Sequence, residues 1–252
     1  MAGFAFLCTP QYITDATDDI FVKSRGFKRP TLPRYALLDH FAFDAALKRQ
    51  YRGCNVEDCW RNFFSVSTDL SSNCPHLHRS GPLWRAVRAS SSLPGVLPPV
   101  YEDGHMLVDG ALVDLVPLGA MRQLKSGPNV IVHFGLPTLE LFDVDYDSIP
   151  GRWRLLASML SPFHRKRLPR APSPVNVLRR SMFANQRRDL LPVGPHDLVI
   201  EPPAFPGSSF MEWDNHRAVY EASYQWARVH IEGLMARQDP ALNAILVASG
   251  LR

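Results

Sequence analysis

The sequence lacks most of the features that would assign it to a specialised class. Its 252 residues hold only four cysteines, too few for a disulfide scaffold. No apolar run reaches the roughly 18–20 residues that a membrane-spanning helix needs. The apolar start follows no positive charge and precedes no cleavage site, so we predict no signal peptide. These absences favour an intracellular protein, either cytoplasmic or bound peripherally to a membrane.

Charge imbalance is also small. The chain has 28 Lys and Arg against 24 Asp and Glu, which gives a net charge of +4. This excess is too small over this length to indicate a nucleic-acid partner. With 46% hydrophobic and 21% charged residues, the composition is that of an ordinary globular protein with enough length for a sizeable core.

Hydrophobic patterning and turn residues predict alternating helices and strands after a poorly patterned first thirty residues. We predict helices over Phe43–Tyr51, Leu83–Ser91, Val116–Lys125 and Asp214–Arg237. Strands are predicted over Phe63–Thr68, Met106–Val108, Asn129–Phe134 and Asp197–Ile200, with a hairpin turn at Asp103-Gly104. The strand at 129–134 has the continuous apolar run of a buried parallel strand. The order strand, helix, strand is typical of an α/β fold.

The predicted helix Asp214–Arg237 is long and amphipathic, and a strongly basic segment precedes it. Its expected core face consists of Ala218, Tyr220, Tyr224, Trp226, Ile231 and Leu234. An acidic loop (Glu140, Asp143, Asp145, Asp147) leads into Arg152–Arg188, which holds ten basic residues and no acidic one. Within it, Ser161–Pro174 is Pro-rich and is predicted to be an exposed connection.

Motifs between residues 56 and 111 are the most informative part of the chain. Gly81–Val100 has the sequence GPLWRAVRASSSLPGVLPPV, and Val108–Ala111 has the sequence VDGA. Upstream lie VSTDL at Val66–Leu70 and VEDCW at Val56–Trp60. Together they resemble the patatin-like phospholipases, in particular the neuropathy-target-esterase branch. The resemblance is specific over Leu32–Gln123 and faint after it.

The resemblance implies a three-layer α/β/α sandwich with a mainly parallel central sheet, in which this chain is N-terminally truncated. Residues 1–137 would be the C-terminal part of the patatin-like domain, and residues 138–252 a basic insert and a helical extension of it. The family is described as hydrolysing lipid esters, such as phospholipids or lysophospholipids, with a Ser–Asp pair and without a cofactor or a metal. Asp109 of the motif Asp109-Gly110-Ala111 would be the general base. A serine hydroxyl needs such a base, and a carboxylate serves if burial raises its pKa.

The nucleophile that this mechanism needs is absent from the sequence. No serine lies in a Gly-x-Ser-x-Gly elbow, and no glycine-rich oxyanion loop precedes Asp109. We expect the chain to begin just after the elbow and the serine to lie outside it. The alternative is a catalytically inactive, lipid- or membrane-associated remnant of the same fold.

Several nearby residues have a simpler interpretation. Ser90, Ser91 and Ser92 lack the glycine-flanked elbow and are predicted to be structural. Asp103 is interpreted as a turn residue and Asp114 as a helix cap. Leu115 departs from the family pattern, which commonly has Asn there.

Two further interpretations concern metals and membranes. A zinc site could be assembled from Cys54, Cys59, Cys74, His76 and His78, but their spacing fits no structural zinc template, so thiols unrelated to metal are favoured. The Arg152–Arg188 segment could contact anionic lipid headgroups. The alternative is a solvated loop and helix face, and we favour this second interpretation because most runs of charged residues are solvated.

Overall fold

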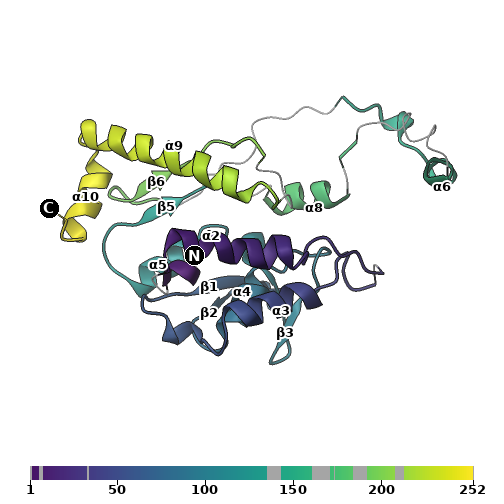
Figure 1. Cartoon of the computed structure of the whole chain (residues 1–252), viewed down its shortest axis with the longest axis horizontal. Helices are drawn as coiled ribbons and strands as arrows, with labels where there is room; N and C mark the ends of the chain where they lie inside the picture. Colours follow the sequence, from purple (N-terminus) through teal and green to yellow (C-terminus); the bar gives the residue numbers. More distant parts are fainter. Residues whose placement is uncertain are drawn as a thin grey trace. The chain divides into compact units, whose positions relative to one another are not determined.

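The computed structural model forms two compact units, residues 1–135 with 186–252, and residues 136–185 (Figure 1). The structure describes residues 2–5, 8–32, 34–134, 143–160, 171–172, 174–183, 192–207 and 213–251. No helix in this described part is both long and apolar enough to span a bilayer. The predicted division at residue 137 stays a prediction.

The N-terminus of the first unit is helical, although its sequence is poorly patterned. Helix α1 covers Ala2–Ala5, α2 covers Pro10–Thr17, and a π-helical segment, η1, follows at Asp18–Lys23. The Thr9 hydroxyl caps α2 by accepting from the Tyr12 N–H, and Pro10 occupies a first-turn position where it loses no hydrogen bond. These cap signals are short and local, so they escape a search for long periodic patterns.

The main core lies between η1 and two further helices. Helix α3 covers Phe41–Gln50 and α4 covers Leu83–Ser90, close to the predicted ranges. Phe43, Leu47 and Leu97 are fully buried there, with Phe21 and Phe27 packed against them. Between these helices runs a short 3-10 turn, η2, at Val56–Asp58.

A four-stranded sheet packs beside α4, with strand order β2-β1-β4-β3. The strands are β1 (Ser65–Asp69), β2 (Cys74–His78), β3 (Val100–Glu102) and β4 (His105–Asp109). All three pairings in this sheet are antiparallel. The Ser65 hydroxyl donates to the Ala86 carbonyl at 3.2 Å, so the face that carries Ser65 is the one covered by α4.

The α/β class is confirmed, but the expectation of a mainly parallel sheet is wrong for the described strands. In the part of the chain that the structure describes, only β5 (Val130–Val132) and β6 (Leu198–Ile200) pair in parallel. The turns explain the difference. Asn73 ends the β1–β2 turn with φ 57°, and Asp103 and Gly104 form the predicted β3–β4 hairpin with φ 48° and 82°. Turns this tight join only antiparallel strands, whereas β5 and β6 have a long connection.

The C-terminal part of this unit is less buried than the sequence indicates. Helix α9 covers His216–Ala236, and α10 (Pro240–Ala248) was not predicted. Of the core face expected on α9, only Leu234 is buried, while Tyr224 is 51% exposed. Val130 and Val132 of β5 are 55% and 52% exposed, so β5 is half-buried and not enclosed on both faces as expected. Burial in this part is confined to a small cluster of Leu198, Leu234 and Leu242.

The start of α9 is fixed to the N-terminal helices. The Trp213 ring stacks on Phe21 with centroids 3.8 Å apart, and Arg217 Nη2 lies 2.8 Å from Asp15 Oδ1. These contacts join residues about 200 positions apart into one unit.

The second unit contains η4 (Tyr146–Ser148), α6 (Arg152–Leu160) and α8 (Pro174–Phe183). Trp153 on α6 is 71% exposed beside Arg152, whose guanidinium lies 4.9 Å from the ring centroid. Glu140 of the predicted acidic loop and most of the predicted connection at 161–174 lie outside the described residues.

Candidate active site

Asp109 ends β4 and precedes the short 3-10 turn η3 (Gly110–Leu112). Its backbone is held from two sides. The Asp109 N–H donates to the Ser92 carbonyl at 3.0 Å, and its carbonyl accepts from the Thr68 hydroxyl at 2.9 Å. The residue therefore has a fixed position between β1 and the segment that follows α4.

The Asp109 carboxylate accepts a hydrogen bond from the Ala111 N–H to Oδ1 at 2.9 Å. Burial raises the pKa of Asp109 above its usual value, and the Ala111 N–H only partly offsets this. Among the described residues no ion pair involves this carboxylate. Such a group is a better proton acceptor than a solvated aspartate.

Glycine is the only residue type that fits at position 110, the start of η3. A methyl group at this position would lie 2.3 Å from the Val66 carbonyl oxygen and 2.8 Å from its carbon. The glycine is needed here because two backbones approach closely, and not because of a positive φ. Asp109, Gly110 and Ala111 thus form one compact turn against the backbone of β1.

A buried hydroxyl–imidazole pair lies on the same sheet face as Asp109. Ser67 is the cross-strand partner of Asp109 on one side and of His76 on the other. Ser67 Oγ lies 2.7 Å from His78 Nε2. Burial, with a smaller contribution from His76, lowers the pKa of His78 to about 4. Because Ser67 is completely buried, its hydroxyl has no access to a substrate.

This pair of Ser67 and His78 was not predicted, because the strand β2 was not predicted. The motif VSTDL indicates the family but assigns no role to Ser67 or Thr68. If a strand at 74–78 is assumed, alternation places His76 and His78 on one face, and this would have identified the pair.

Ser90 ends α4, and the hydroxyls of Ser91 and Ser92, which follow it, are engaged in local bonds. Ser92 is completely buried, and its hydroxyl contacts both Arg88 Nη1 and the Arg88 carbonyl. The Ser91 hydroxyl donates to the Val87 carbonyl. Arg88 is itself buried and pairs with Asp44 at 2.7 Å. These hydroxyls are part of the packing around Arg88.

The interpretation of Asp114 as a helix cap is wrong. Helix α5 covers Leu118–Leu124 and begins two residues later than predicted, with Pro117 at its N-cap. The Asp114 carboxylate instead accepts from the Val116 N–H, while burial raises its pKa. Asp114 lies three residues before the N-cap of α5, outside the position from which a side chain caps a helix.

The cysteines do not assemble with the histidines into a metal-ligand group in the described part of the chain. All four are free thiols. An open cavity of about 840 Å³ lies between α5, the start of β5 and α10, and its lining includes Arg122, Asn129 and Val247. Asp109 is not part of that lining.

Comparison with known proteins agrees with the motifs. The family model described as patatin-like phospholipase matches residues 16–122, which include β1 to β4, Asp109 and the turn after it. These residues therefore match the patatin-like phospholipase family, as the motifs indicate.

The relatives lie in the neuropathy-target-esterase branch of these patatin-like proteins. A putative patatin-like phospholipase domain-containing protein of Caenorhabditis elegans is 40% identical over 128 residues, 50% of this chain and 12% of that protein. Patatin-like phospholipase domain-containing protein 6 of Homo sapiens is 28% identical over 209 residues, 81% of this chain and 15% of that protein. Lysophospholipase nte1 of Aspergillus fumigatus is 27% identical over 206 residues, which are 81% of this chain and 13% of that protein. The chain therefore spans only a small part of the length of these relatives.

Proposed function

We propose that this chain carries the general-base part of a lipid acyl hydrolase, with Asp109 as the base. The carboxylate would take the proton of a serine hydroxyl as the serine oxygen attacks the ester carbonyl, and would give that proton to the alcohol oxygen that leaves when the acyl-enzyme forms. Water would then attack the acyl-enzyme with its proton passing to the same carboxylate, which releases the fatty acid and returns a proton to the serine. The observation that carries the proposal is the partly buried carboxylate on the Gly110 turn, which accepts from the Ala111 N–H, forms no ion pair within the described residues and has a raised pKa. The names of the relatives, phospholipase and lysophospholipase, indicate the substrate class.

The proposal includes a serine supplied from outside these 252 residues, because the sequence contains no Gly-x-Ser-x-Gly elbow. It also includes the three-layer α/β/α arrangement around that elbow. The same absence motivates the second candidate, an inactive remnant that keeps the scaffold and the lipid-facing surface.

A comparison of two aspartates tests the assignment of the base. In a product that includes the in-frame coding sequence upstream and hydrolyses a lysophospholipid, Asp109→Asn should lower kcat by about 10²–10⁴-fold. Asp114→Asn is the matched control, since it removes a neighbouring carboxylate whose pKa burial also raises, and should leave kcat within a factor of a few. Retained turnover in the Asp109 variant would remove it from the mechanism.

A serine-directed fluorophosphonate probe tests the location of the nucleophile. The 252-residue chain by itself is expected to stay unlabelled. Labelling that survives alanine at Ser90, Ser91 and Ser92 would place a nucleophile elsewhere in this chain. A longer product without an elbow and without ester turnover would favour the inactive remnant.

Peripheral contact with anionic membranes through Arg152–Arg188 is also part of the proposal. In the second unit, α6 carries Arg152 and Arg154 next to exposed Trp153 and Leu156. Basic side chains beside exposed apolar ones are typical of helices that lie in the interface of an anionic bilayer.

A further inference from the structure

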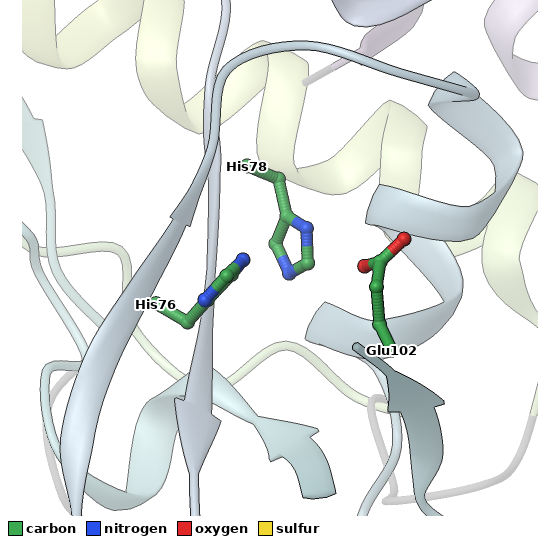
Figure 2. Close-up of side chains that lie close together, drawn as sticks. All are labelled: His76, His78 and Glu102. Carbon is green, nitrogen blue, oxygen red and sulfur yellow. The ribbon is translucent and has the colours of Figure 1, made fainter. Parts of the chain in front are cut away.

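Two histidines and a glutamate converge on the sheet face that α4 covers. His76 and His78 leave β2 on the same side, and their ring centroids are 4.6 Å apart. Glu102 is the last residue of β3, at the opposite edge of the sheet. One potential ligand atom from each of the three lies within 4.8 Å of the others. In Figure 2, His78 stands between His76 and Glu102.

We propose that His76, His78 and Glu102 form a zinc-binding site. Two imidazoles and one carboxylate are a donor set that zinc accepts, with the fourth position left to water. Ligand atoms around a tetrahedral zinc ion, each about 2.0–2.1 Å from it, are separated by about 3.4 Å. Partly exposed His76 and Glu102 can close the remaining distance by small side-chain rotations, whereas buried His78 stays fixed.

Ser67 supplies the outer support that such a site needs. Its hydroxyl lies 2.7 Å from His78 Nε2, so Nδ1 is the ring nitrogen of His78 available to a ligand. Metal-binding histidines commonly keep one nitrogen on a fixed partner, which sets the orientation of the ring. A bound ion would link the two edge strands β2 and β3 across the face that carries Asp109.

Arg85 is the group that opposes metal binding. Its Nε lies 3.6 Å from Glu102 Oε1, and its Nη2 donates to the Tyr101 carbonyl at 2.7 Å. The guanidinium competes for the carboxylate and repels a cation. The site should therefore bind zinc with moderate affinity, and removal of this charge should strengthen the binding.

Calorimetric titration of the EDTA-treated, metal-free chain with zinc tests the proposal. The expected result is one zinc ion per chain, bound about tenfold or more weakly by each of His76→Gln and Glu102→Gln. Two controls should bind like the unaltered chain: His196→Gln, which removes an exposed histidine outside the group, and Cys74→Ser, which removes the thiol two residues before His76. Arg85→Gln should bind more tightly than the unaltered chain.

A second measurement covers the case in which a variant folds poorly. Saturating zinc should raise the Tm of the unaltered chain by about 5 °C and that of the Glu102 variant by much less. Absence of zinc binding overturns the proposal, as does equal affinity in the Glu102 variant. Loss of binding in the Cys74 variant alone would assign the zinc to a thiol site and also overturn it. None of these readouts depends on ester hydrolysis.

Discussion

Replacement of Gly110 by alanine probes how the Asp109 turn is built. The added methyl group would lie 2.3 Å from the Val66 carbonyl oxygen and 2.8 Å from the carbonyl carbon. Both contacts are with backbone, so no side-chain rotation relieves them. To reach 3.0 Å from the oxygen, η3 and β1 must separate by at least 0.7 Å.

The strand is not free to make this movement. β1 is paired along five residues with β2 and along three with β4, and Ser67 within it is completely buried. Overpacking of this kind costs about 1–3 kcal/mol, and the rigid backbone contact favours the upper end. For a chain of this size the Tm should fall by about 5–10 °C.

Urea unfolding followed by circular dichroism measures this change, with Gly119→Ala as the matched control. Gly119 lies in α5, and a methyl group there would meet nothing within 4 Å. That control should be neutral or stabilising by up to about 1 kcal/mol, because alanine favours the helix. A Gly110→Ala chain within about 0.5 kcal/mol of the unaltered one would refute the close approach of η3 to β1.

Three more predictions follow from charge and burial. Burial raises the pKa of Asp109, so the folded chain binds a proton on this carboxyl group more tightly than the unfolded chain does. The free energy of unfolding therefore falls as pH rises through the folded-state pKa of Asp109. Asp109→Asn should increase the free energy of unfolding at pH 7. His78, with its pKa lowered to about 4, has the opposite effect: in EDTA, the free energy of unfolding should fall by about 2 kcal/mol from pH 7.5 to pH 5, and His78→Gln should remove most of this slope. Co-sedimentation with anionic vesicles should weaken with salt and in a chain with Arg152→Glu and Arg154→Glu, whereas salt-independent binding would contradict the electrostatic contact.

Elements with a strong local signal were predicted well. The hairpin at Asp103-Gly104 formed as expected, because these two residues adopt the positive φ values that its turn requires. Helix α4 ended before Pro94, and α3 was placed within two residues of its predicted bounds. In each case the deciding interactions lie within a few residues of the chain.

Elements whose stability depends on distant partners were predicted poorly. β2 reads Cys-Pro-His-Leu-His, which has little apolar alternation, and it exists because β1 pairs with it. Arginine is rarely fully buried, yet Arg88 is buried and contacts Asp44, Ser92 and the Pro98 carbonyl. The mainly parallel sheet was implied by the resemblance to the patatin-like family, but the short turns between the described strands make their sheet antiparallel.

By itself the sequence determined the family, the motif Asp109-Gly110-Ala111 and the local helices and turns, because these depend on residue type and short-range geometry. Only the tertiary structure decided that Gly110 packs against the Val66 backbone and that Glu102 lies close to His76. It also decided that Ser67, the cross-strand partner of Asp109, places its hydroxyl on His78. Such contacts depend on strand register and on the path of the chain between distant residues. A one-residue shift in register would turn every one of these side chains to the other face of the sheet.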